Sequence, residues 1–231
     1  MSKSLGILRR RQASQLRSRA KPGRQTIVAR LLYDAERWNP SIRLVLKKIG
    51  MPTPMYAQHV DSQPPVNNKP VGYDLAVGDW IAPHGKGQTS DIIFLRQFSK
   101  RSRFDYDSTL TVSFPNAGDG IQQFAVEPDE GVSDLCSPRQ APSGGYMAKV
   151  ERVNISHPPE TVKWDYDPNR KYFFRVRTVL DEKGNVKSAL YGKIYGDFMH
   201  FTYYLNPTPN DRNIEFDPKQ NLLPNQHVTA P

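Results

Sequence analysis

Hydrophobic and polar residues alternate with a period of two through most of the chain after residue 70. The alternation is clearest between Phe104 and Phe114, where every second position from Leu110 onward is a large apolar residue. This spacing predicts a strand with one buried and one solvated face. Residues 92–95 form a short apolar run that is typical of a more buried strand. Further strands are predicted at residues 121–126, 146–155, 161–166, 171–180, 186–195 and 197–205.

Residues 171–180 and 186–195 form the most distinct pair of predicted strands. Between them, Asp181 to Asn185 supply a turn in which Gly184 or Asn185 can take a positive φ. About eight short strands separated by Gly and Pro turns, with no helix between them, predict a mainly β fold. We expect an antiparallel β-sandwich, or a barrel-like domain, at residues 71–205.

The residues before this domain show a different pattern. Apolar residues recur at helical spacing between Ile27 and Ala35, and again between Ile42 and Ile49. The sequence therefore predicts a partly helical extension at residues 1–50. Its two amphipathic segments are expected to dock on the body or to lie on a membrane or partner surface.

Two further segments are predicted from their composition. Residues 51–70 carry five prolines and little periodicity, which predicts an extended linker. Residues 206–231 are rich in Pro and Asn and are expected to form a C-terminal coil.

Positive charge is concentrated in the extension. Residues 1–48 contain 13 Lys and Arg and two acids, whereas residues 49–231 contain 19 basic and 21 acidic residues and so carry a net charge of −2. A basic segment of this kind attracts a polyanion or an anionic membrane surface. The alternatives are a solvated leader without a partner, or residues upstream of the true start. The candidate anion-binding residues are Arg9, Arg10, Arg11, Arg17 and Arg19.

The sequence shows no membrane-spanning helix and no readable export signal. No window approaches the roughly 18 consecutive apolar residues that a spanning helix needs. The Arg-rich and Ser-rich start overlaps in composition with organelle transit peptides, but no apolar stretch of the length found in secretory signals follows it.

Little in the sequence indicates chemistry, and we predict no catalytic, cofactor-binding or metal-binding residue. Cys136 is the only cysteine, which excludes an internal disulfide framework, and the five histidines show no ligand-type spacing. The segment His84 to Thr89 resembles a phosphate loop but lacks the required order of Gly, Lys and Ser or Thr.

Carboxylate pairs of the kind that glycosidases use are one alternative. Turn-forming Asx residues at strand ends are the other. The residues concerned are Asp105, Asp107, Asp165, Asp167 and Asp197.

Four tyrosines on neighbouring predicted strands form the candidate ligand-binding group. Exposed aromatic rings on a sheet can stack on sugar rings or bases, so a carbohydrate or protein ligand is expected there if the rings face solvent. If they face inward, they fill the core or form cross-strand pairs. The group consists of Tyr191, Tyr195, Tyr203 and Tyr204.

The blocks Tyr191 to Phe198, Tyr203 to Asn213 and Glu215 to Pro218 resemble the C-terminal end of a group of uncharacterised bacterial proteins. The members of that group resemble exported or cell-surface proteins with a mostly β body. The resemblance implies an extracytoplasmic setting and brings no activity, cofactor or catalytic residue. Physically, the turn formers between residues 206 and 213 favour a structural clasp.

Together these observations lead us to expect a non-enzymatic β-sandwich protein, structural or ligand-binding, in an extracytoplasmic setting. The first alternative is a protein that associates with nucleic acid or an anionic surface through its basic extension. The second is a hydrolase on a β scaffold.

Overall fold

The computed structural model describes residues 50–61, 63–124, 138–224, 226 and 228–229, together with the backbone of residues 24–29 and 42–47. The anion-binding candidates between Arg9 and Arg19, and also Cys136, lie outside the described residues. Within the described part, regular structure consists of strands and contains no helix, so the expectation of a mainly β fold is confirmed there.

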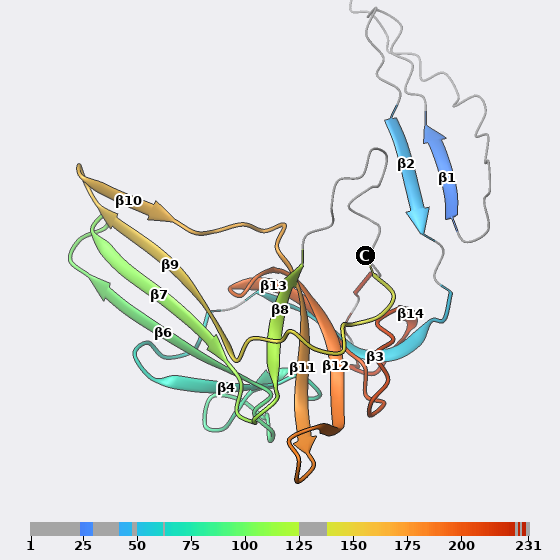
Figure 1. Ribbon diagram of the computed structural model, residues 1–231. Coiled ribbons are helices and arrows are strands. Elements are labelled where there is room, and N and C mark those ends of the chain that lie inside the picture. The colour runs from blue at the N-terminus through green and yellow to red at the C-terminus, as the bar shows by residue number, and fades with distance from the viewer. Residues whose placement is uncertain are drawn as a thin grey trace, which may run out of the picture. The chain divides into compact units, whose positions relative to one another are not determined.

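The strands are numbered in chain order, and Figure 1 shows their arrangement. Their bounds are β1 (Arg24–Ala29), β2 (Ile42–Lys47), β3 (Thr53–Asp61), β4 (Pro70–Asp74), β5 (Asp79–Trp80), β6 (Ile92–Lys100), β7 (Tyr106–Ser113), β8 (Gly120–Phe124), β9 (Lys149–His157), β10 (Thr161–Trp164), β11 (Lys171–Leu180), β12 (Val186–Asp197), β13 (His200–Leu205) and β14 (Phe216–Asn221).

The described parts of the extension are strands rather than the expected helices. β1 and β2 pair as antiparallel neighbours, with Arg24 opposite Lys47 and Ala29 opposite Ile42. In sequence, Ile42, Leu44 and Leu46 follow a two-residue repeat, although Ile42, Val45 and Leu46 also follow a helical one. β-branched residues also favour strands over helices, and both segments contain them. The backbone of residues 24–29 and 42–47 is therefore extended, and the remaining residues of the two expected helical segments lie outside the described residues.

Two six-stranded sheets make up the body. The first has the order β10-β9-β7-β6-β4-β5 and the second the order β14-β3-β13-β12-β11-β8. Neighbours are antiparallel except for β14, which pairs in parallel with β3. One hydrophobic core joins the two sheets. Its fully buried members include Phe94 and Val112 from the first sheet and Phe174, Ile194 and Tyr203 from the second.

The expected linker at residues 51–70 contains a strand of the second sheet. β3 lies between β13 and β14, and its residues Met55 and Ala57 are fully buried. The five prolines stand at positions 52, 54, 64, 65 and 70, which leaves residues 55–63 free to pair. Because proline lacks only its own N–H, prolines at the ends of a segment do not prevent a strand between them.

The C-terminal segment, expected to be a coil, contains β14 and a series of Asx turns. The side chains of Asn206, Asp211 and Asn213 each accept a hydrogen bond from the backbone N–H two residues further on. The structural clasp predicted for residues 206–213 is therefore present. Two further contacts join this segment to residues 139–141: Arg212 donates to the carbonyl of Ala141, and Glu215 pairs with Arg139.

Two further clusters pack against the face of the second sheet that points away from the central core. One contains Phe173 and Tyr191 together with Ile214, and the other contains Met55 and Tyr204. Close packing at β12 requires Gly192, because a Cβ there would lie 2.2 Å from the Phe174 ring. The second sheet is thus covered on both faces, whereas part of the first sheet is not.

Candidate functional site

Four strands of the first sheet extend beyond the central core. We call the outer parts of β6, β7, β9 and β10 the arm, which runs away from β8, β11 and β12 in Figure 1. Side chains that stand opposite one another in an antiparallel pair lie on the same face. The cross-strand row of Phe94, Val112 and Val150 belongs to the core or packs against it. The rows further out define the same face where the second sheet no longer covers it.

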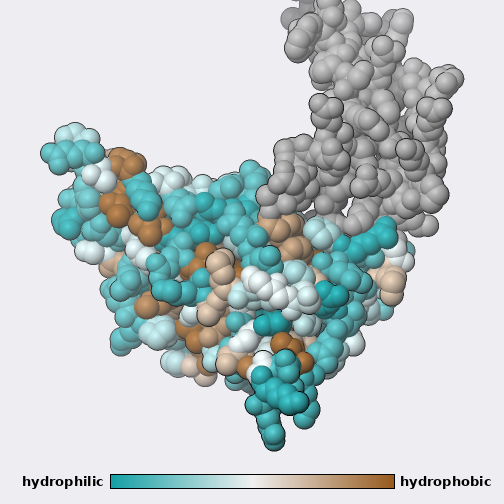
Figure 2. Space-filling view, in the orientation of Figure 1, coloured by the Kyte–Doolittle hydropathy of each residue, from teal (hydrophilic) through white to brown (hydrophobic). Residues whose placement is uncertain are grey.

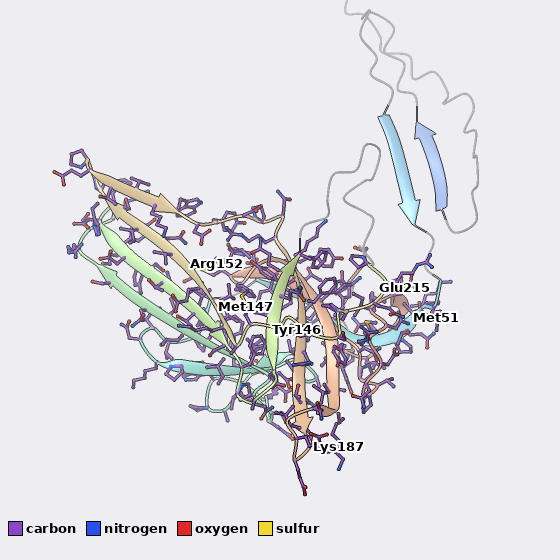
Figure 3. All side chains as sticks on the ribbon, viewed as in Figure 1. Met51, Tyr146, Met147, Arg152, Lys187 and Glu215 are labelled. Carbon is purple, nitrogen blue, oxygen red and sulfur yellow. The ribbon has the colours of Figure 1, made fainter. Side chains whose placement is uncertain are left out.

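The row Arg96–Leu110–Arg152 marks the boundary between core and open face. Leu110 is buried, and two guanidinium groups flank it from β6 and β9. Arg152 lies where the arm meets the second sheet (Figure 3), with its guanidinium carbon 5.7 Å from the Tyr172 ring centroid. Arg152 also donates a hydrogen bond to the Tyr172 hydroxyl.

Arg96 is held in a fixed position on this face. Its guanidinium carbon lies 4.5 Å from the centroid of the Phe98 ring, and its Nε donates to Ser108 Oγ at 3.4 Å. A further nitrogen donates to Gln63. Burial lowers the pKa of Arg96 from its ordinary value, but a guanidinium stays protonated in proteins. The face therefore carries a positioned cation beside an aromatic ring.

The next row crosses all four strands of the arm. Phe98 stands opposite Ser108, Ser108 opposite Asn154, and Asn154 opposite Trp164. Trp164, on the edge strand β10, is 63% exposed. Asn154 Oδ1 accepts a hydrogen bond from the Asp165 N–H at 2.8 Å, which leaves its Nδ2 without a partner among the described residues. A hydrogen-bond donor thus lies between two aromatic side chains.

Tyr106 adds a further ring, whose centroid is 6.4 Å from that of Phe98. We use the name arm face for the set formed by these side chains, which contains three aromatic rings, polar groups and one guanidinium, but no carboxylate. The arm face consists of Arg96, Phe98, Tyr106, Ser108, Asn154 and Trp164. Such a surface can stack on flat apolar faces and donate hydrogen bonds between them.

The tyrosines selected from the sequence do not form an exposed group. Tyr191, Tyr203 and Tyr204 are at most 5% exposed, and only Tyr195 is partly accessible. Tyr203 donates to the carbonyl of Leu75 at 2.8 Å inside the core. Tyr191 does lie on the outer face of β12, as its parity suggests, but the chain after β13 covers that face. Three of the four rings are thus buried, which agrees with the alternative that they fill the core, and only Tyr195 remains partly accessible.

The five aspartates considered for a hydrolase separate into two groups, each arranged around a cation. In the first group, His157 lies between two carboxylates, with Nδ1 2.6 Å from Asp105 Oδ1 and Nε2 2.9 Å from Asp107 Oδ1. Arg101 pairs with both carboxylates as well. Hydrogen bonding to Asp105 is the main cause that raises the pKa of His157.

The second group surrounds Arg170. Its guanidinium binds Asp165 directly and lies 3.9 Å from carboxylate oxygens of both Asp167 and Asp197. Asp197 is almost fully buried, and burial is the main cause that raises its pKa. In both groups the carboxylates are occupied by a basic partner, so neither resembles an open acid–base pair.

The loop that contains His84 and Lys86 has no resemblance to a phosphate loop in structure. Asp79 accepts hydrogen bonds from the N–H groups of Trp80 and Lys86, and strand β6 rather than a helix follows the loop.

Among the described residues, no group of three or more His, Cys, Asp or Glu side chains is arranged to hold a metal ion. That part of the chain also contains no helix that is long and apolar enough to cross a membrane.

Sequence reasoning missed the arm face because its members come from four strands. The alternation along residues 104–114 places Tyr106 on the same face as Leu110, but nothing in the sequence places Trp164 near them. The alternation does not show where the second sheet ends, and only that boundary separates buried from open rows.

A scan against models of known families and searches of curated proteins and of solved structures all return no match for this chain.

Proposed function

We propose that the protein is a non-enzymatic β-sandwich module that binds a carbohydrate chain across the arm face. The observation that carries this proposal is the row across four strands in which Phe98 and Trp164 stand at the two ends, with Ser108 and Asn154 between them. Sugar rings present apolar C–H faces to aromatic rings and hydroxyl groups to amides and guanidinium groups. Because the sheet holds these side chains before a ligand arrives, binding loses little conformational freedom.

The charge of the body favours a saccharide over a single-stranded nucleic acid. Aromatic platforms also bind bases, but such proteins add a positive groove that follows the phosphates. Residues 49–231 carry a net charge of −2, and Arg96 is engaged by protein groups. The resemblance of the C-terminal block to exported proteins supports an extracytoplasmic location, where polysaccharides are common ligands.

Binding of the full-length protein to a panel of immobilised polysaccharides tests the proposal. We expect Trp164→Ala and Phe98→Ala each to weaken binding by about 1–2 kcal/mol, because each removes a stacking surface. Asn154→Ala removes a directional donor and is expected to cost about 1 kcal/mol. Val179→Ala, on the exposed part of β11, is the matched control and leaves affinity unchanged.

Three results would contradict the proposal. One is the absence of binding to every polysaccharide. Another is binding that Trp164→Ala leaves intact in a variant with an unchanged thermal midpoint. The third is preferential binding of single-stranded DNA by the arm face, with the same loss in Trp164→Ala, which would assign the face to the nucleic-acid alternative.

A further inference from the structure

The outer end of the arm exposes large apolar side chains. Phe104, in the turn between β6 and β7, is 65% exposed, and Val162 on β10 is 71% exposed. The two are brought to the same end because Ser156 lies opposite Val162 and donates from its Oγ to the Phe104 carbonyl at 2.6 Å. Figure 2 shows apolar residues at the surface of this end, at the upper left.

Cations lie beside these apolar side chains on both faces of the arm: Lys100 stands in the row of Tyr106, Ser156 and Val162, whereas Lys163 shares the other face with Ile155. Lys100, Arg103 and Lys163 are exposed, and none of them makes an ion pair with a described residue. The Arg103 guanidinium carbon lies 5.4 Å from the Phe104 ring centroid, so cation and ring point the same way. We call Lys100, Arg103, Phe104, Val162 and Lys163 the arm tip.

The acids near the arm tip are mostly neutralised. Asp105 and Asp107 are engaged by Arg101 and His157, as described above. Glu160, in the turn between β9 and β10, makes no ion pair with a described residue and opposes the cations. The arm tip therefore carries more positive than negative charge. Protonation of the His157 ring, which its hydrogen bonds to both carboxylates favour, adds to this positive charge.

We propose that the arm tip docks on a lipid bilayer that contains anionic headgroups. An aromatic side chain flanked by Lys and Arg suits the membrane interface, because the ring enters the boundary region while the cations face the headgroups. The site differs from the arm face and from the basic extension at residues 1–50. The charge of the arm tip indicates the partner. An apolar protein surface would cover Phe104 and Val162, but it would leave the three cations of the arm tip without anionic partners.

Partition of the full-length protein to phosphatidylcholine vesicles, with and without phosphatidylglycerol, provides the test. Every variant keeps the basic extension, so its contribution is common to all. We expect Phe104→Ser to weaken partition to the anionic vesicles about tenfold and Arg103→Gln about fivefold. Glu160→Gln is expected to strengthen it. Thermal midpoints equal to that of the unchanged protein establish that each variant folds.

A matched control comes from the hairpin between β11 and β12, which ends beside Lys187 (Figure 3). Its exposed Val179 is accompanied by two lysines and two acids, so its charges cancel. Val179→Ser leaves partition unchanged. In a Cys136→Ser background, an environment-sensitive fluorophore on Phe104→Cys shifts to the blue on anionic vesicles, whereas the same label on Val179→Cys does not.

Two results would overturn the inference, and both leave the proposed carbohydrate site untouched. In one, the protein sediments with anionic vesicles while the label at position 104 stays in water, which assigns all binding to the extension. In the other, Phe104→Ser and Arg103→Gln partition like Val179→Ser. Carbohydrate binding is measured in the absence of vesicles, so its failure is distinguishable from either result.

Discussion

Arg177 and Asp91 form a two-point ion pair that links the two sheets. Arg177 Nε donates to Asp91 Oδ1 at 2.8 Å, and one terminal nitrogen donates to Oδ2 at 3.0 Å. The same nitrogen reaches Asp74 at 3.2 Å. Asp91 precedes β6 of the first sheet and is fully buried, whereas Arg177 belongs to β11 of the second sheet, where φ is 55°. The pair therefore fixes the end of the segment between β5 and β6 against β11.

Removal of the cation from this pair is expected to be costly. Burial raises the pKa of Asp91 above its ordinary value even though Arg177 binds it, so the carboxylate depends strongly on its partner. Arg177→Met leaves both buried aspartates without that partner, and we expect the free energy of unfolding to fall by about 3 kcal/mol. Urea denaturation measures the loss.

Arg101→Met is the matched control, because it breaks ion pairs at an exposed position. We expect it to change the unfolding midpoint far less than Arg177→Met does. Equal losses in the two variants would show that burial does not strengthen the Arg177 pair.

The group around His157 predicts a pH dependence of stability. The folded pKa of His157 is raised, so its contribution is fully present below the ordinary histidine pKa and is lost as the pH rises through the folded pKa. The pKa of Asp105 is lowered, mainly by its hydrogen bond to His157, so its contribution is lost as the pH falls through that lower value. The group thus stabilises the arm most between these two limits.

Histidine resonances in an NMR titration test this directly. We expect one histidine, assigned by its absence in His157→Gln, to titrate above the ordinary range, and Asp105→Asn to move it back. A His157 ring that titrates normally would contradict the bridging geometry.

Two glycines with positive φ separate backbone preference from crowding. At Gly184 φ is 80° and no atom lies within 4 Å of the position that a Cβ would take, whereas at Gly196 φ is 103° and a Cβ would meet the His200 carbonyl at 2.5 Å. We expect Gly184→Ala to cost about 1 kcal/mol and Gly196→Ala to cost about 3 kcal/mol or more, because its backbone must also move. Thermal unfolding compares the two, and similar costs would refute the role of crowding.

Tyr203 is expected to be important for stability rather than for binding. Tyr203→Phe leaves the Leu75 carbonyl without its donor in the interior and is expected to lower the free energy of unfolding by about 1–2 kcal/mol. Its carbohydrate affinity stays unchanged below the unfolding transition. Loss of affinity without loss of stability would return the tyrosine group to the candidate site.

Much of the strand pattern follows from local sequence. The alternation around Leu110 predicts β7, the Asp181 to Asn185 turn predicts the β11–β12 hairpin, and Gly184 takes the positive φ expected there. Each of these depends on neighbours within a few residues. The errors arose where two periodicities overlap, as in residues 42–47, or where prolines at both ends obscured a strand, as in β3.

The candidate site could not be predicted in the same way. Tyr191 and Tyr106 both lie in strands that the sequence predicts, yet Tyr191 is buried under the chain after β13 and Tyr106 lies on the arm face. A period of two assigns a side chain to a face of its strand, and it contains no information about what covers that face.

By itself, the sequence determined the strands between residues 92 and 205 with their turns, the near-neutral body and the concentration of positive charge before residue 49, because these depend on composition and on spacing along the chain. Only the tertiary structure decided which sheet faces are covered, which aspartates contact Arg170 or His157, and where the first sheet extends beyond the second. Those features depend on pairs of residues far apart in sequence, whose contact is set by strand order and register.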